Sequence, residues 1–246
     1  DWTTYFETLP AHIFEISLES EADRMHNSQF DPEEVAKERS VVISEREGNE
    51  NHPRFLLSEA VQDAAFSRHP YKYEVIGLKE DLRSITRDDL FEHYQRYYRP
   101  GNAVLAIAGD FETGSMLEKI NSYFSEIPDR DEPDAAVTQD PPLGEEKRIS
   151  VTGPGETSYV QISYRAPQAG NTDFFTLTVL DSLLTGPSSL NMFGSGGTTN
   201  KTSRLYRALV EGEISVSCHG GLQATLDPYL YTIHLTVHPA HTPKDV

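Results

Sequence analysis

Residues 31–51, DPEEVAKERSVVISEREGNEN, carry a strong helix-start signal. The side chain of Asp31 can accept hydrogen bonds from the first backbone N–H groups of a helix, and Pro32 suits the first helical position. Glu33 and Glu34 follow in the first turn, where negative charge is favoured by the helix dipole. The stretch therefore predicts a long helix that is capped by Asp31.

Two carboxylates in this helix, Glu38 and Glu45, are seven residues apart. Seven residues make close to two turns, so both side chains point the same way. Val41 and Val42 lie between them on or near that face. Burying a carboxylate is costly unless something pairs with it, so a metal or a catalytic cationic centre is one explanation. The alternative is a solvated helix whose Glu residues pair with nearby basic residues, namely Lys37, Arg39 or Arg46.

The composition limits the classes of protein that fit. The chain has 246 residues, enough for one large domain or two ordinary ones, and its hydrophobic content of 37% supports a packed core. No apolar run reaches membrane-spanning length, so we expect no membrane segment. The net charge of −18 and the absence of a basic run argue against nucleic acid as a partner. An acidic surface suits basic substrates or partners, or simply solubility.

The other residues that could carry chemistry are not arranged for it. Cys218 is the only cysteine, and His219 beside it points to the opposite face of a strand, so the two do not form a catalytic pair. His234 and His238 share a sheet face but are too far apart to chelate a metal easily. The glycine-rich residues 194–199 lack the G-K-[ST] ending of a phosphate loop and are interpreted as a loop before the next helix.

Periodic apolar residues predict mostly helix before residue 100, over residues 11–25, 31–51, 54–66, 79–85 and 86–98. The apolar run AVLAIA at residues 103–108 then predicts a buried strand, and residues 114–126 predict an amphipathic helix. This order favours helices packed on a sheet.

Prolines and acidic residues replace the periodic pattern over residues 128–146, which predicts a linker between domains. Beyond the linker, strands are expected at residues 148–152, 159–164, 214–220 and 230–237. Helices are expected at residues 173–184 and 203–211. The second half is therefore expected to be a layered domain too, which suggests a structural repeat.

Four segments together resemble a known family: ERSVVISE (38–45), HPYKYEVIG (69–77), LFEHYQRYYRPGNAVLAIAGDF (90–111) and TSRLYRALVE (202–211). They are similar to zinc metallopeptidases of the pitrilysin/insulinase type, a group that includes mitochondrial processing peptidase and its bacterial relatives. The resemblance covers nearly the whole chain and keeps the order of the segments.

The resemblance implies an α+β fold of two similar layered domains, each a mostly antiparallel sheet covered by helices on one face. Residues 1–127 would form the C-terminal part of the zinc-bearing first domain, and residues 128–146 the linker. Residues 147–246 would form the N-terminal part of the second domain, which binds no metal. Nothing in the sequence indicates the compartment.

In this family an H-x-x-E-H motif supplies two histidine ligands of Zn²⁺ and the glutamate general base, and a later glutamate supplies the third ligand. The resemblance assigns the third ligand to Glu45 and a supporting role at the catalytic site to Glu38. Zinc in such a site polarises the scissile carbonyl and lowers the pKa of its bound water. Because H-x-x-E-H is absent from the 246 residues, we expect a fragment of a longer protein that neither binds catalytic zinc tightly nor cleaves peptides alone.

The resemblance also implies the partners, which are a peptide substrate and a second half or homologous subunit that completes the active chamber. Many members have an arginine where this chain has Val210, and a tyrosine after it that is missing here. This suggests that another half or subunit supplies the residues that contact the substrate. Because Glu38 and Glu45 are both present, the leading hypothesis is the metal-bearing half of a zinc endopeptidase. The alternatives are a non-catalytic paralogue that serves as scaffold or partner subunit, and a plain α/β interaction domain.

Overall fold

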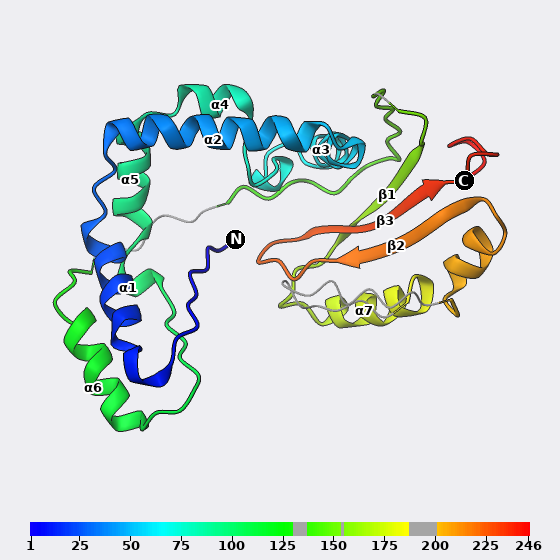
Figure 1. Cartoon of the computed structure of the whole chain (residues 1–246). Coiled ribbons are helices and arrows are strands. Elements are labelled where there is room, and N and C mark those ends of the chain that lie inside the picture. The colour runs from blue at the N-terminus through cyan, green and yellow to red at the C-terminus, as the bar shows by residue number, and fades with distance from the viewer. Residues whose placement is uncertain (130–136, 154, 187–200) are drawn as a thin grey trace. The chain divides into compact units, whose positions relative to one another are not determined.

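The computed structural model describes residues 1–129, 137–153, 155–186 and 201–246 (Figure 1). The chain divides into two compact units that are not contiguous in sequence. The sheet unit comprises Asp1, Arg46–Ile76 and Val137–Val246, and the helical unit comprises Trp2–Glu45 and Gly77–Ala136. The predicted domains 1–127 and 147–246 stay a prediction, because they concern the longer protein.

The helical unit is built from α1 (Glu15–Asn27), most of α2 (Pro32–Glu50), α4 (Lys79–Ser84), α5 (Arg87–Tyr97) and α6 (Thr113–Phe124), with short 3₁₀ turns at Ala11–Ile13 and Pro100–Asn102. Its α5 begins with a reciprocal capping box between Thr86 and Asp89, as the sequence predicts. Tyr94 of α5 is buried and packs against Phe30 at 5.2 Å between ring centroids. Aromatic packing of this kind holds α5 against the chain that leads into α2.

The start of α2 confirms the predicted cap. The Asp31 Oδ1 atom accepts hydrogen bonds from the backbone N–H groups of Glu33 at 2.8 Å and Glu34 at 3.2 Å. The helix then continues without a break to Glu50. The expected long helix is therefore present, with both Glu38 and Glu45 inside it.

The sheet unit contains α3 (Pro53–Ala65), a 3₁₀ turn (Pro70–Lys72), α7 (Thr172–Leu184), a short π-helix (Tyr206–Val210) and three strands, β1 (Tyr159–Ala166), β2 (Ser215–Leu222) and β3 (Tyr229–Val237). The strand order is β1-β3-β2, and β3 is antiparallel to both neighbours. Thus β1 and β2 run parallel with β3 inserted between them, and Figure 1 shows α7 along one side of this sheet. The α+β class is confirmed.

One face of the sheet forms the core of this unit. Its buried members include Cys218, Tyr231, Ile233 and Leu235, which alternate along the strands with residues of the other face. The predicted strands at residues 159–164, 214–220 and 230–237 and the helix at 173–184 are confirmed, with ends that differ by one or two residues.

Two predicted strands are wrong for the described chain. Residues 103–108 and 148–152 form no strand, and Val104 is 97% exposed where a buried side chain was expected. The backbone at Ala103 is extended, with φ −129° and ψ 150°. A strand also needs a hydrogen-bonded neighbour, and no segment of the described chain pairs with either run. The described part of the helical unit therefore contains no sheet.

Two predictions fall wholly or partly on residues 130–136, 154 and 187–200, which lie outside the described residues. They are the middle of the linker at residues 128–146 and the glycine-rich loop at residues 194–199. The described ends of the linker, residues 128–129 and 137–146, contain no helix or strand.

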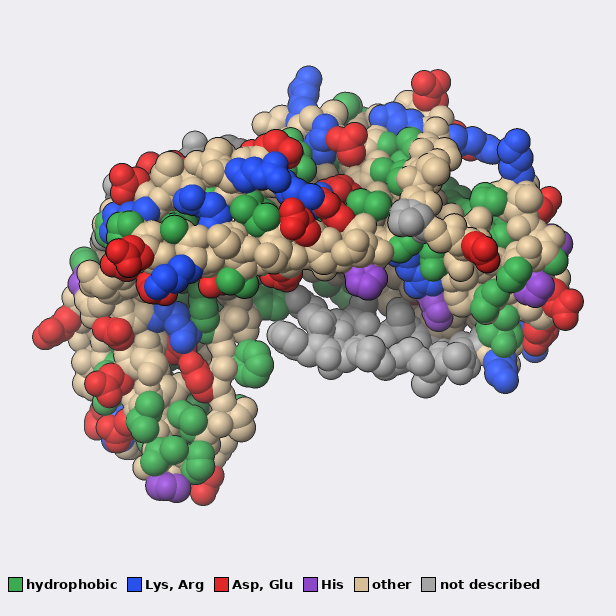
Figure 2. Space-filling model, turned by 45° about the horizontal axis from the view of Figure 1, so that its top comes forward, with side chains coloured by type: hydrophobic (Ala, Val, Ile, Leu, Met, Phe, Trp, Pro, Cys, Tyr) green, Lys and Arg blue, Asp and Glu red, His purple; other side chains and the backbone are tan. Residues whose placement is uncertain are grey.

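Charged side chains of both signs are interspersed across the face shown in Figure 2. On this face the net charge of −18 is therefore not concentrated in one block. Within the described ranges, no helix has both the length and the apolar character needed to cross a membrane.

Candidate functional site

The two carboxylates of α2 lie on one exposed face of the helix. Glu38 and Glu45 are both exposed, and Val41 between them is 58% exposed. Arg46, which follows Glu45 and lies about 100° further round the helix, is 5% exposed and anchors the adjoining side. The predicted common direction of Glu38 and Glu45 thus corresponds to the face that the rest of the described chain leaves open.

Neither carboxylate has a partner among the described residues, because the nearby basic side chains are engaged elsewhere. Lys37 pairs with Glu34 at 2.6 Å, and Arg39 donates to the backbone oxygen of Ile85 at 2.5 Å. Arg46 pairs with Glu50 and Glu59. The alternative of a solvated helix is therefore supported in part. Its residues Glu34 and Glu50 pair with Lys37 and Arg46, whereas Glu38 and Glu45 are exposed without such a pair.

Arg46 fixes the C-terminal part of α2 within the sheet unit. Its Nη2 atom donates to both carboxylate oxygens of Glu59, at 2.6 and 2.8 Å, and its Nε atom donates to Glu50 at 3.1 Å. The guanidinium also lies 5.0 Å from the ring centroid of Phe55. Burial raises the pKa of nearby Glu74, while Arg46 acts to lower it. This cluster holds the helix that carries Glu45.

The described residues do not make up a zinc site by themselves. Zinc is held by three or four protein ligands in ordinary sites. No group of three His, Cys, Asp or Glu side chains within the described ranges is placed to hold a metal ion. A single exposed carboxylate such as Glu45 fits the donor chemistry of one ligand, but the remaining donors must come from elsewhere.

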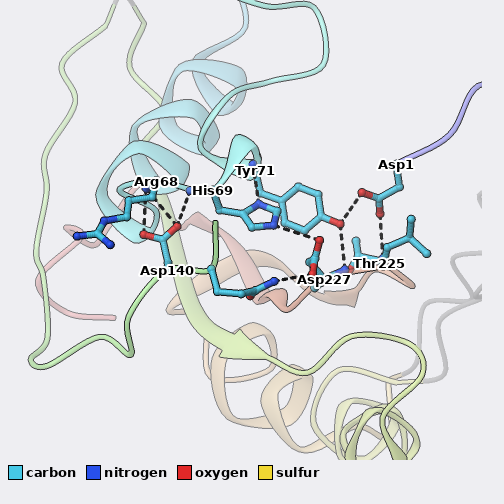
Figure 3. Close-up of polar contacts among 9 residues, drawn as sticks. Asp1, Arg68, His69, Tyr71, Asp140, Thr225 and Asp227 are labelled. Atoms are coloured by element: carbon cyan, nitrogen blue, oxygen red, sulfur yellow. Dashed lines mark hydrogen bonds and ion pairs between the residues drawn. The ribbon is translucent and has the colours of Figure 1, made fainter. Parts of the chain in front are cut away.

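A second polar cluster, which the sequence did not single out, surrounds His69 (Figure 3). His69 is 3% exposed, and its Nδ1 atom accepts a hydrogen bond from the backbone N–H of Tyr71 at 3.1 Å. The ring proton of the neutral form therefore sits on Nε2, which lies 3.3 Å from Asp227 Oδ2. The two atoms are close, but their geometry does not meet that of a hydrogen bond. The Tyr71 hydroxyl contacts Asp1 at 2.5 Å.

Asp140 binds the chain on the other side of His69. Its carboxylate accepts hydrogen bonds from the backbone N–H groups of Ser67 at 2.6 Å, Arg68 at 3.1 Å and His69 at 2.7 Å, and from the Ser67 hydroxyl at 2.5 Å. Partial burial raises the pKa of Asp140, but these hydrogen bonds outweigh it and hold the pKa well below its usual range. The cluster joins segments distant in sequence, which indicates a structural role.

Replacing Asp140 by Asn is expected to destabilise the chain by about 1–3 kcal/mol at pH 7, because backbone donors lose an ionised acceptor. The pKa of Asp140 is lowered on folding, so its contribution is complete above the unfolded pKa of about 3.9 and is lost as the pH falls towards the folded value. Urea unfolding at pH 7 and pH 3 checks this. Asp88→Asn, with its side chain 90% exposed, is the control and should change little. An equal effect of Asp140→Asn at both pH values contradicts the account.

The face of the sheet opposite the core is polar and brings three side chains into one row. Gln161 of β1 lies opposite His234 of β3, which lies opposite His219 of β2. Cys218, next to His219, is buried on the core side, where burial raises its pKa to about 11. The prediction that Cys218 and His219 face opposite ways is confirmed. The pairing of His219 with His234 was missed, although a hairpin turning at residues 226–227 brings these two residues opposite each other.

Known proteins similar to this chain are peptidases and their relatives. The family model described as "Peptidase M16 inactive domain" matches residues 84–246. The "Uncharacterized zinc protease YmxG" of Bacillus subtilis is 23% identical over 193 residues, covering 78% of this chain and 46% of that protein. "Cytochrome b-c1 complex subunit 1, mitochondrial" of Bos taurus is 27% identical over 169 residues, covering 68% of this chain and 35% of that protein.

The fold is shared with a solved structure described as a protease from Helicobacter pylori. The two superpose with a TM-score of 0.83 at 22% sequence identity, covering 96% of this chain and 55% of that one. The chain thus spans about half the length, or less, of the relatives it matches. The α2 helix, with Glu38 and Glu45, precedes the segment that the family model matches.

Proposed function

Because this chain belongs to the peptidase M16 family through the inactive-domain model that matches residues 84–246, we propose that it is part of a zinc-dependent endopeptidase. In this proposal α2 supplies Glu45 as one zinc ligand and Glu38 as a supporting carboxylate. The substrate is a peptide or an unfolded segment of a protein. The chain by itself is inactive, because the histidines of H-x-x-E-H are not among its 246 residues.

The observation that carries the proposal is the open face of α2. Two carboxylates two turns apart are exposed there without a partner in the described chain, while every nearby basic side chain named above is engaged. A ligand must keep its oxygen free for the metal, and a rigid helix places it reproducibly. The Arg46 cluster supplies that rigidity. Its ion pairs are with Glu50 and Glu59, so they leave the carboxylate of Glu45 free.

Glu38 has a different role from Glu45 in this proposal. Residues that do not bind the metal directly orient the ligands that do, and their loss typically costs 10–100-fold in metal affinity or activity. A carboxylate two turns before a ligand, on the same open face, suits this role. We therefore expect replacement of Glu45 to reduce zinc binding and peptide hydrolysis more than replacement of Glu38.

A non-catalytic partner subunit is the second candidate. Val210 occupies the position where the resemblance leads us to expect an arginine that contacts substrate, and one relative is named as a subunit of the cytochrome b-c1 complex. In this alternative Glu38 and Glu45 take no part in binding a metal. The two candidates therefore differ in whether the longer protein binds zinc through α2.

The test compares Glu45→Gln with the native residue in the full-length protein. Loss of a ligand that carries charge is expected to reduce peptide hydrolysis by about 10³-fold or more and to lower zinc content, whereas Glu38→Gln should cost about 10–100-fold. Elemental analysis measures the zinc content, and cleavage of an unfolded reporter protein measures hydrolysis. Glu33→Gln, an exposed residue in the first turn of α2, is the control and should leave both unchanged. Full zinc content and rate in Glu45→Gln would reject the proposal.

A further inference from the structure

The polar face of the sheet gathers one arginine and two histidines without a carboxylate among them. We define the basic row as Gln161, His234 and His219, which lie opposite one another across β1, β3 and β2, together with Arg54 of α3 beside it. Opposite residues in antiparallel strands have Cβ atoms about 4.5–5.5 Å apart, so the two imidazoles can contact a common ligand. His219 is exposed and His234 is half-buried.

Arg54 is fixed beside this row with most of its donors unused. Its Nη2 atom donates to the Thr236 hydroxyl at 2.6 Å, and its guanidinium lies 5.1 Å from the ring centroid of Tyr159. Thr236 is two residues from His234 and shares its face, and it is also contacted by the Ser217 hydroxyl at 2.9 Å. A guanidinium has five N–H donors, and within the described ranges only this one hydrogen bond uses any of them.

The electrostatic surroundings of His234 are positive. Burial lowers its pKa first, and the charges of Arg54 and His219 lower it further. The charged or titratable groups facing it are Arg54 from α3, Tyr159 from β1 and His219 from β2. None of Arg54, His219 and His234 has an ion pair with an acidic residue of the described chain. In a protein with a net charge of −18, an unneutralised basic cluster is a local exception.

We propose that the basic row is a recognition site for a carboxylate of a bound peptide, held by Arg54, His219 and His234. The inference rests on the proposed peptide-binding function and narrows its substrate class to segments that carry an acidic side chain. Arginine binds a carboxylate through charge-assisted hydrogen bonds, and the two imidazole rings can donate further N–H hydrogen bonds to it.

The test measures binding of short fluorescent peptides to the full 246-residue chain by anisotropy, at low salt and at pH 6 and pH 8. The first peptide has a central Glu and an amidated C-terminus, and the second has Gln in its place. We expect the Glu peptide to bind about tenfold more tightly than the Gln peptide, with a larger ratio at pH 6. A third peptide, with Gln and a free C-terminus, shows whether a terminal carboxylate also suffices.

Variants then assign the preference to residues. Arg54→Gln is expected to remove most of the preference for Glu at both pH values, and Arg54→Lys to keep part of it. The double variant His219→Gln, His234→Gln should remove the pH dependence and keep a weaker preference. Arg148→Gln is the matched control, because its side chain is 88% exposed and lies away from the strands in sequence. Thermal unfolding shows that each variant is folded.

Equal affinity for all three peptides overturns the inference, and so does a preference for Glu that Arg54→Gln leaves intact. Both results leave the proposed function standing, because zinc content and hydrolysis in the full-length protein depend on Glu45. Conversely, a preference for Glu in a protein whose Glu45→Gln variant keeps its zinc would support the basic row and reject the metal role of α2.

Discussion

Replacing Arg46 by Ala is expected to lower the free energy of unfolding by about 3–5 kcal/mol, the usual cost of removing one partner of a buried ion pair. Arg46 is 5% exposed and contacts both Glu50 and Glu59. Their side chains are only 27% and 23% exposed, so the variant leaves two poorly solvated carboxylates without a cation. Loss of the stacking on Phe55 adds to the effect.

The effect of Arg46→Ala should depend on pH. The pKa of Glu74 is raised by burial and opposed by Arg46, so it rises further in the variant. A carboxyl group whose folded pKa exceeds its unfolded pKa loses its stabilising contribution as the pH rises through the folded value. The destabilisation should therefore be smaller at pH 4 than at pH 7. Urea unfolding at both pH values measures it.

Lys37→Ala is the control for Arg46→Ala. Lys37 lies on the same helix, and its pair with Glu34 is solvent-exposed, with 67% of the Lys37 side chain accessible. Exposed pairs contribute about 0–1 kcal/mol, so this variant should be close to native. If Arg46→Ala costs no more than Lys37→Ala, the Arg46 cluster does not hold α2 as described.

Replacing Gly220 by Ala is expected to destabilise the sheet unit by about 2–4 kcal/mol through overpacking. A Cβ atom at Gly220 would lie 2.3 Å from Asp181 Oδ1 and 2.6 Å from two side-chain atoms of Thr185. Asp181 cannot move aside easily, because it is 1% exposed and its Oδ1 atom accepts hydrogen bonds from the Tyr231 hydroxyl at 2.9 Å and from Thr185 at 2.7 Å. Accommodating the methyl group must disturb α7 or break these bonds.

Gly221→Ala is a close control, because it changes the same residue type at the next position of the same strand. A Cβ atom there meets nothing within 4 Å, since it points to the polar face. The expected change in stability is therefore within about 0.5–1 kcal/mol. Thermal and urea unfolding compare the two variants. Similar costs for both would mean that strand propensity, and not contact with Asp181, sets the effect.

Local signals predicted the helices well. Asp31, Pro32 and the capping residues Thr86 and Asp89 act through atoms only a few positions away, so their effect is readable from sequence. The strands were less certain, because a strand depends on a distant partner. Residues 103–108 have the composition of a buried strand and still lack a hydrogen-bonded neighbour in the described chain.

The candidate sites also combine features that are readable from local sequence with features that depend on distant segments. The spacing of Glu38 and Glu45 follows from the helical period, but their exposure and lack of partners depended on where Arg39 and Arg46 point. The network of His69 with Asp140 and Asp227 joins residues more than 70 positions apart and had no local signal. Neither the exposure of Glu38 and Glu45 nor the His69 network could be found from residue spacing alone.

The sequence by itself determined the helix at residues 31–51, the shared direction of its two carboxylates, and the family through the order of four segments. These depend on backbone geometry and on residues close together in the chain. Only the tertiary structure decided that the face of Glu38 and Glu45 stays open, and that Arg54, His219 and His234 share one side of a sheet. Partners and burial are set by chain segments far apart in sequence, whose contacts form only when the protein folds.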